Sequence, residues 1–177
     1  MKQPVILVSP GAILDAGCGT GENALFLANQ GYEVTGIDTA GAAIRKAKEK
    51  SRERRVPAVF LEWDALQISG LGKRFDTVID CGLFHVFSDE ERPLYLYVEG
   101  LSLVLVPGGT FRMLCFSGME SGDWGPRRVT QNEIHEAFSD GVFAIAITLL
   151  AQVFQLELPH PVLTNGRADN HRSPYSL

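Results

Sequence analysis

With 177 residues, the chain has the length of one compact domain that buries most of the apolar surface its unfolded form would expose. Hydrophobic residues make up 45% of it and charged residues 21%, a composition that excludes a disordered chain and a membrane-embedded one. The net charge is −5, which disfavours binding to a phosphate backbone, so we expect no nucleic-acid partner.

No segment carries the signals of secretion or of membrane insertion. Residues 1–10 lack the apolar region and cleavage site of a secretory signal, and the longest apolar run, at 141–153, is too short and too polar to span a bilayer. The three cysteines have no partners at metal-ligand spacing, so we expect reduced thiols and no metal site. These observations predict a cytoplasmic protein without membrane association, with one domain at 1–158 and a polar tail at 159–177.

Short apolar runs alternate with segments of helical periodicity along the chain. The predicted elements are a strand at 12–15, a helix at 22–29, a strand at 32–38, a helix carrying the basic run 45–55, strands at 58–61 and 75–81, a helix at 88–105 opened by the capping pair Ser88 and Glu91, a strand at 110–116, a helix at 131–138 and two final strands after Gly141. The basic run is typical of a solvated helix face. The alternation predicts an α/β fold, a doubly wound, Rossmann-like parallel sheet with an antiparallel strand at one edge.

The most informative segment is Asp15-Ala-Gly17-Cys-Gly19-Thr-Gly21, which lies between the first strand and the first helix. Glycines let the backbone turn sharply and approach a ligand without side-chain clash. Asp38, which ends the second strand, is placed to accept hydrogen bonds from two ribose hydroxyls. Together they predict a nucleoside site. The third glycine comes one residue earlier than in the dinucleotide pattern, which disfavours an NAD(P)-dependent oxidoreductase.

The run from Ile13 to Gly21 resembles the first motif of the class I S-adenosylmethionine (SAM)-dependent methyltransferases. The likeness continues in the family's order through Gly36-Ile-Asp38, Trp63-Asp64-Ala65, 75–80 and 105–109. It implies a seven-stranded sheet whose last strand is antiparallel. It also implies SAM as the cofactor, lying across the carboxyl ends of the first two strands, and S-adenosylhomocysteine as the product.

The resemblance further implies which residues hold the cofactor. They are Asp15, Gly17 and Gly19 at the methionine moiety, Cys18 and Gly21 in the same loop, Asp38 at the ribose, Thr39, Asp64 and Ala65 at the adenine, and Cys81 near the sulfonium. Two of them have alternative explanations, since Asp64 would also suit a surface turn and Cys81 a small buried filler.

The segment 80–87 is similar to the corresponding stretch of thiopurine and halide/thiol methyltransferases, and the chain shares the style of tellurite-resistance methyltransferases. This likeness implies a small-molecule acceptor, with a thiol or other heteroatom compound ranked first and halide, phenol and heterocycle acceptors left open.

Two residues of this segment are catalytic candidates. His85 could deprotonate a thiol or hydroxyl, because its pKa is ordinarily near neutrality, or could be a packing histidine. Asp80 would either orient a substrate or cap the backbone amides of its loop. The expected pocket residues are Phe84, Phe87, Trp124 and Arg127. Core packing explains the two phenylalanines equally well, and a surface loop is the competing explanation for Trp124 and Arg127.

Both ends of the chain depart from the family pattern. Residues 1–12 are short for the helical segment that commonly covers SAM there, and the last strand gives way to the polar tail. We therefore expect a minimal domain, whose missing cover a second copy in a homodimer could supply. A non-catalytic SAM-binding or interaction module is the main alternative. A macromolecular methyltransferase is disfavoured by the acidity and by the lack of an Asn-Pro-Pro-Tyr-type motif.

Overall fold

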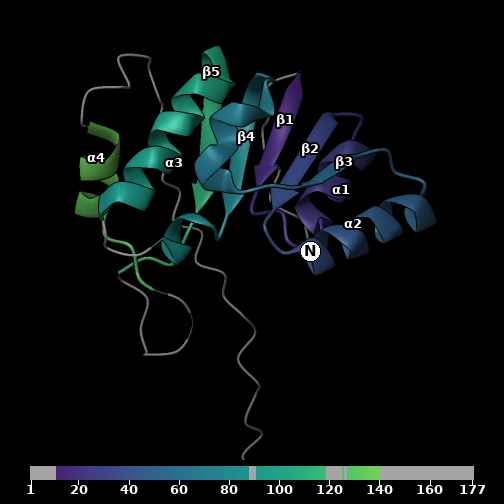
Figure 1. The fold of residues 1–177 in the computed structure, drawn as a ribbon, viewed down its shortest axis with the longest axis horizontal. Coiled ribbons are helices and arrows are strands. Elements are labelled where there is room, and N and C mark those ends of the chain that lie inside the picture. Colours follow the sequence, from purple (N-terminus) through teal and green to yellow (C-terminus); the bar gives the residue numbers. More distant parts are fainter. Residues whose placement is uncertain (1–10, 88–90, 119–124, 126, 140–177) are drawn as a thin grey trace, which may run out of the picture.

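The computed structural model describes residues 11–87, 91–118, 125 and 127–139. Within these ranges the chain forms one five-stranded sheet in the order β3-β2-β1-β4-β5, with every neighbouring pair parallel (Figure 1). The strands are β1 (Ala12–Ala16), β2 (Glu33–Asp38), β3 (Val59–Glu62), β4 (Phe75–Cys81) and β5 (Leu105–Leu114). The predicted α/β, Rossmann-like class is confirmed. The two further strands after Gly141, and the boundary between domain and tail, lie outside the described residues.

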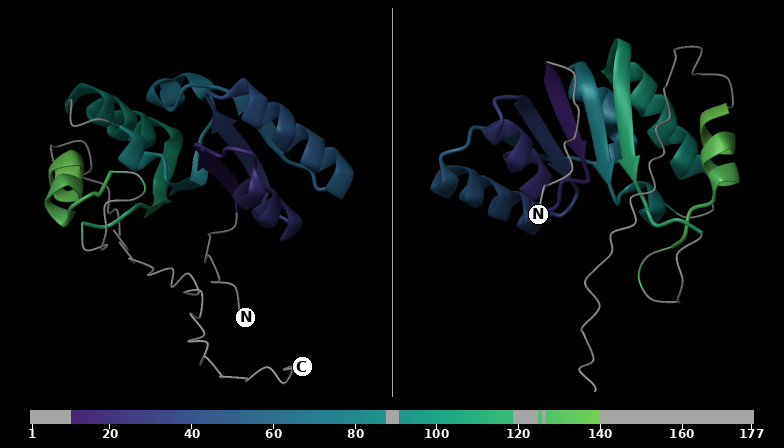
Figure 2. Two further views of the ribbon diagram at one scale, coloured as in Figure 1. Left: turned by 90° about the horizontal axis from the view of Figure 1, so that it is seen from below. Right: turned by 180° about the vertical axis from the view of Figure 1, so that it is seen from behind.

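Helices cover both faces of the sheet (Figure 2). Helices α1 (Glu22–Asn29) and α2 (Gly41–Arg54) contribute to one buried cluster, whereas η1 (Ala65–Leu71), α3 (Glu91–Val104) and α4 (Gln131–Ser139) contribute to the other. A short 3₁₀ turn, η2 (Phe84–Val86), follows β4. No helix within the described ranges has both the length and the apolar character needed to cross a membrane.

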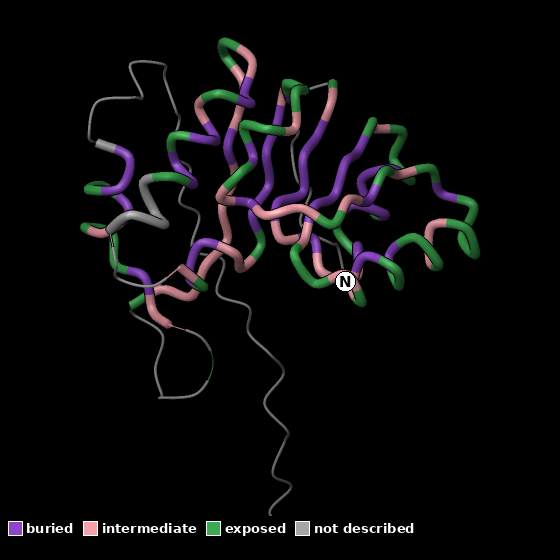
Figure 3. Tube along the Cα trace, viewed as in Figure 1, coloured by how far each residue is buried: buried purple, intermediate pink, exposed green. Residues whose placement is uncertain are grey.

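The central strands read as nearly continuous apolar runs because both of their faces are covered. Ile13, Leu14 and Val78 have no exposed surface, and Ile79 is almost as deeply buried. Figure 3 shows the same pattern, with buried segments following the strands and exposed segments following the outer helix faces. Burial on both faces therefore sets the parallel strands at the centre of the domain.

The structure differs from the prediction at the start of β5. Leu105 already pairs with Phe75, and the ladder then shifts register before it resumes with Thr77 opposite Thr110. The segment Pro107-Gly108-Gly109, which lies between the predicted helix and the predicted strand, is therefore part of an irregularity inside β5, and the helix itself stops at Val104. Proline has no N–H to donate to a ladder, so a bulge is a favourable place for it. The expected cap at Ser88 lies outside the described residues.

The topology brings five loops to one edge. All strands are parallel, so the loops after β1, β2, β3, β4 and β5 leave from their carboxyl ends on the same side. The strand order reverses between β1 and β4, and ligands of open α/β sheets bind at such a switch point. The fold thus places the glycine-rich loop beside the segment that follows β4.

Gly100 on α3 predicts a stability effect. A Cβ there would lie 2.3 Å from Cγ2 of Ile68, a fully buried residue of η1. We expect Gly100→Ala to lower the free energy of unfolding by about 1 kcal/mol, because overpacking costs more than the roughly 0.8–1 kcal/mol that alanine adds to helix propensity. Urea denaturation measures it. The control Leu103→Ala, at an exposed position of the same helix, should change stability little. An equally or more stable Gly100→Ala protein would contradict the close packing of η1 on α3.

Candidate functional site

The three glycines of the loop after β1 adopt left-handed backbone conformations, but for different reasons. A Cβ at Gly17 would lie 2.9 Å from the Leu83 side chain, and one at Gly21 would lie 2.7 Å from the Phe60 ring. Glycine is therefore required at both positions, because a Cβ would collide with these side chains. A Cβ at Gly19, where φ is +52°, would meet nothing within 4 Å. Gly19 is thus the position of this loop that faces open space, where a ligand can approach the backbone.

Asp38 fixes this loop at the end of β2. Its Oδ2 accepts a hydrogen bond from the Gly19 N–H at 2.9 Å, and its Oδ1 accepts one from the Ala40 N–H at 2.8 Å. A carboxylate oxygen can accept more than one hydrogen bond, so both oxygens retain capacity for ligand hydroxyls. Asp38 is therefore both the anchor of the loop and a half-buried acceptor beside the open side of Gly19.

The Cys18 side chain faces the interior. A Cβ at Gly36 would lie 2.9 Å from its Sγ, and its backbone N–H donates to the Ile37 carbonyl at 2.9 Å. Burial, together with the negative charges of Asp15 and Asp38, raises the pKa of the Cys18 thiol to about 12. Only the backbone of Cys18 is therefore available at the loop surface.

Asp15 is buried, and its Oδ2 has no hydrogen-bond partner among the residues that the structure describes. Burial raises the pKa of its carboxyl group to about 7, against the effect of the Ala24 N–H, and the charges of Asp80 and Asp38 raise it further. A buried carboxylate without a full set of partners is costly. A cationic ligand group beside Asp15 would offset that cost.

Asp80 has both oxygens engaged. Its Oδ1 accepts hydrogen bonds from the N–H groups of Leu83 at 2.8 Å and Phe84 at 3.3 Å, and its Oδ2 accepts one from the hydroxyl of Tyr97 at 2.9 Å. Burial raises the pKa of Asp80 to about 6, and these hydrogen bonds oppose the rise. Asp80 caps the backbone of its loop, as one of the two predicted roles requires, and so holds the turn that carries His85.

His85 lies in that turn with 9% of its surface exposed. Its ring lies nearly perpendicular to that of Phe116, with 5.7 Å between the ring centroids, and its Nδ1 has no hydrogen-bond partner in the described part of the chain. Burial, assisted by the positive charge of Arg127, lowers the pKa of the imidazole. The ring is therefore neutral at neutral pH and can accept a proton.

The segment after β5 returns beside His85. The Gly118 N–H donates to the Val129 carbonyl at 3.0 Å, and the Val129 N–H donates to the Phe116 carbonyl at 2.8 Å. The Arg128 guanidinium lies 5.2 Å from the centre of the Phe116 ring, and Arg127 pairs with Glu133 at the start of α4. Arg127 thus has both a structural contact and an electrostatic effect on His85. Trp124 lies outside the described residues.

The phenylalanines of the segment 80–87 are placed in packing contacts. Phe84 has no exposed surface and stacks on Phe138 at 6.1 Å, so it packs in the core and does not line an open wall. Phe87 is half-buried and lies 5.0 Å from the Tyr97 ring.

The remaining predicted cofactor residues lie at the ends of β2, β3 and β4. Thr39 is exposed directly after β2. Asp64 caps η1 by accepting from the Leu66 N–H at 2.9 Å, and Ala65 is buried. Cys81 is exposed as a residue, yet desolvation of its thiol, with Asp15 and Asp80 nearby, raises the thiol pKa to about 11.

Sequence reasoning missed Tyr97 and Phe116. Tyr97 is fully buried on α3, where its hydroxyl donates to Asp80. The one signal in the sequence is a tyrosine on an apolar helix face, because a buried tyrosine hydroxyl needs a hydrogen-bond partner. Phe116 follows β5, and no local pattern links it to His85.

A family model described as a methyltransferase domain matches residues 13–109. The 2-heptyl-1-hydroxyquinolin-4(1H)-one methyltransferase of Mycobacteroides abscessus is 34% identical over 132 residues, which are 73% of this chain and 57% of that protein. An uncharacterised methyltransferase of Schizosaccharomyces pombe is 39% identical over 106 residues, which are 59% of this chain and 71% of that protein.

Among solved structures, one reported with the conversion of a disulfide bond into a thioacetal group during echinomycin biosynthesis superposes with a TM-score of 0.66 and 37% identity. The match covers 76% of this chain and 63% of that one. The chain therefore spans about three fifths of the length of that structure and of the quinolinone enzyme. The family model covers more than half of the sequence and ends after the Pro-Gly-Gly segment of β5, so the chain belongs to the class I SAM-dependent methyltransferases.

Proposed function

We propose that the chain transfers a methyl group from SAM to a heteroatom of a small molecule. The observation that carries the proposal is the buried Oδ2 of Asp15, which has no partner among the described residues and lies in the strand that leads into the Gly19 loop. Asp15 is influenced by the charges of Asp80 and Asp38, so a cation at this edge of the sheet is electrostatically favoured.

The donor and acceptor set fits SAM. SAM carries positive charge on its sulfonium and amino groups, and the carboxyl groups at the ends of β1, β2 and β4 complement that charge. Asp38 offers acceptor capacity for two ribose hydroxyls, and Gly19 leaves room for close backbone approach. We propose that Thr39, Asp64 and the backbone of Ala65 lie nearest to the adenine.

Bound SAM supplies an already activated methyl group, so the protein mainly aligns the acceptor, excludes water and takes up a proton when the acceptor carries one. His85 is the proposed base. Its neutral ring can accept a thiol or hydroxyl proton, and its buried Nδ1 has no hydrogen-bond partner within the described ranges. Asp80 acts through the loop, since its hydrogen bonds to Leu83 and Phe84 hold the turn that carries His85.

Two relatives support a heteroatom acceptor. The name of the Mycobacteroides abscessus enzyme specifies a hydroxyquinolinone, and the echinomycin structure is reported with chemistry at a disulfide bond. The likeness of the segment 80–87 to thiopurine and halide/thiol methyltransferases adds support for a soft acceptor. We therefore propose a small thiol or an acidic hydroxyl on an aromatic heterocycle. The proposal includes no nucleic-acid substrate.

A non-catalytic SAM-binding module remains the second candidate. It is favoured because both Asp80 oxygens already accept hydrogen bonds from the loop and from Tyr97. Of the two predicted catalytic residues, His85 alone then keeps a ring nitrogen without a partner among the described residues. Methyl transfer to any acceptor in a panel of thiols, hydroxyquinolinones and iodide would exclude this candidate.

Proton release should accompany SAM binding. The pKa of Asp15 is about 7 in the free protein, so roughly half of the molecules carry a proton on Asp15 at pH 7. A cation favours the ionised carboxylate and lowers the pKa, and we expect up to about half a proton to be released per SAM. Calorimetric titration at pH 7 in buffers of different ionisation enthalpy measures the release. In Asp15→Asn the release should disappear. A heat of binding independent of the buffer in the wild type would contradict the placement of a cation beside Asp15.

His85 should matter only for acceptors that carry a proton. We expect His85→Gln to lower the rate of methyl transfer to a thiol or hydroxyquinolinone about 100-fold, with little change for iodide, which needs no base. Because the pKa of His85 is lowered, wild-type activity toward protonated acceptors should persist below pH 6.5 before it falls. Initial rates with labelled SAM measure both effects. An equal loss of activity toward iodide would show that His85 acts through packing.

A further inference from the structure

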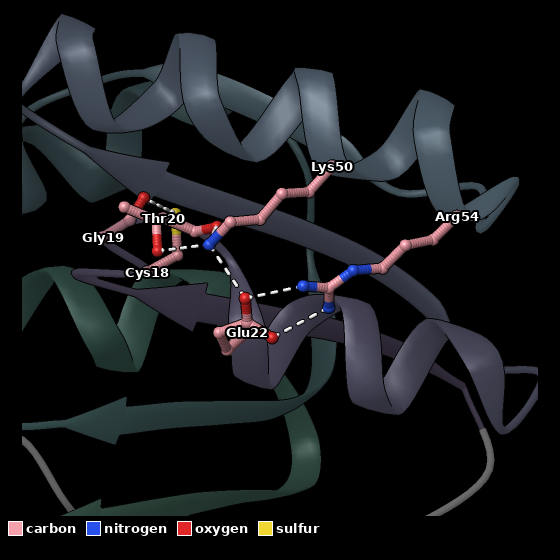
Figure 4. Close-up of polar contacts among 6 residues, drawn as sticks. All are labelled: Cys18, Gly19, Thr20, Glu22, Lys50 and Arg54. Carbon is pink, nitrogen blue, oxygen red and sulfur yellow. Dashed lines mark hydrogen bonds and ion pairs between the residues drawn. The ribbon is translucent and has the colours of Figure 1, made fainter.

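The basic run on α2 is predicted to form a solvated helix face, but one of its residues, Lys50, is largely buried. The side chain of Lys50 is only 17% exposed, whereas that of Arg54, one turn later, is 47% exposed. Both side chains point from α2 toward the glycine-rich loop and the start of α1 (Figure 4). The face of α2 that carries Lys50 is therefore turned toward the loop after β1.

Lys50 uses all three donors of its ammonium group on this neighbouring segment. Its Nζ donates to the Thr20 carbonyl at 3.1 Å, to the Thr20 hydroxyl at 2.7 Å and to Oε1 of Glu22 at 2.8 Å. An ammonium group has three hydrogens, so these contacts satisfy it completely. Two of the three fall on Thr20, the residue between Gly19 and Gly21.

The loop is thus held at adjacent residues from two elements. The Asp38 carboxylate at the end of β2 accepts from the Gly19 N–H, and Lys50 on α2 donates to Thr20. Glycine-rich segments lose much conformational freedom when they become ordered. A loop that is already ordered binds its ligand without that cost.

We propose that Lys50 is a positioning residue for the cofactor, because its contacts with Thr20 hold the Gly19 backbone in the conformation that binds SAM. This inference rests on the proposed SAM site. It assigns Lys50 no contact with SAM itself, and it separates Lys50 from the other cations of the basic run.

The exposed ion pair between Arg54 and Glu22 makes no hydrogen bond with Thr20. Glu22 is 58% exposed and accepts two hydrogen bonds from Arg54, at 2.8 and 2.9 Å. The hydrogen bonds from Arg54 and Lys50 lower the pKa of Glu22 to about 2, but exposed pairs of this kind contribute little to stability. Removing Arg54 should therefore leave the loop in place, which makes Arg54→Met a matched control for Lys50→Met.

The experiment compares four variants with the wild type. They are Lys50→Met, the conservative Lys50→Arg, Arg54→Met, and Lys46→Met at an exposed lysine of the same helix. SAM affinity is measured by calorimetry, global stability by urea denaturation, and hydrogen exchange is measured at the amides of 19–21 without ligand.

For Lys50→Met we expect SAM to bind about ten-fold more weakly and the amides of 19–21 to exchange faster, with an unchanged urea midpoint. Lys50→Arg should recover most of the affinity, and Lys46→Met and Arg54→Met should bind within about two-fold of the wild type.

Three outcomes would overturn the inference, and they are distinguishable. If the wild type binds SAM and Lys50→Met binds it equally well, the positioning role is wrong and the proposed function stands. If the wild type does not bind SAM, the proposed function fails and the inference fails with it. A Lys50→Met protein whose affinity and urea midpoint fall together, without rescue by Lys50→Arg, would also overturn it, since that result describes a purely structural residue.

Discussion

The site depends on one repeated interaction, in which a carboxylate at or near the carboxyl end of a parallel strand accepts hydrogen bonds from backbone N–H groups of the loops at that edge of the sheet. Asp38 holds Gly19 and Ala40, Asp64 begins η1, and Asp80 holds Leu83 and Phe84. Because these strands are parallel, the carboxyl groups gather at one edge of the sheet. The same bonds that shape the loops therefore concentrate negative charge where the strand order reverses.

This concentration of charge restricts what can bind. It adds to the burial that raises the pKa of the Asp15 carboxyl group and of the Cys18 and Cys81 thiols. A further anion would be repelled, whereas a cation would relieve the mutual repulsion. Among the residues that the structure describes, the one buried carboxylate oxygen with no hydrogen-bond partner is Oδ2 of Asp15, at the entrance to the glycine-rich loop. A positively charged nucleoside such as SAM meets both the electrostatic and the hydrogen-bonding requirement.

Local pattern predicted the order of the strands and helices and the position of the loop, because periodicity and glycine placement are properties of short segments. It could not separate the roles of Gly17, Gly19 and Gly21, since these depend on whether Leu83 or Phe60 packs against the backbone. The burial of Phe84 and the low exposure of Lys50 likewise depend on contacts with residues distant in the sequence. The sequence also contains a capping box for α4 that the sequence analysis missed. The backbone N–H of Thr130 donates to the Glu133 carboxylate, and the backbone N–H of Glu133 donates to the Thr130 hydroxyl.

The proposed SAM site lies at the carboxyl edge of the sheet and is formed by Asp38 and the Gly19 backbone. Calorimetric titration of SAM into the wild type and Asp38→Ala tests it most directly, with Glu33→Gln, at the opposite and exposed end of β2, as the matched control. We expect saturable binding at one site, weakened about 30-fold or more in Asp38→Ala because hydrogen bonds to a charged acceptor are lost, and unchanged in Glu33→Gln. A wild type that does not bind SAM, or an Asp38→Ala variant that binds it equally well, would show that SAM does not bind at this site.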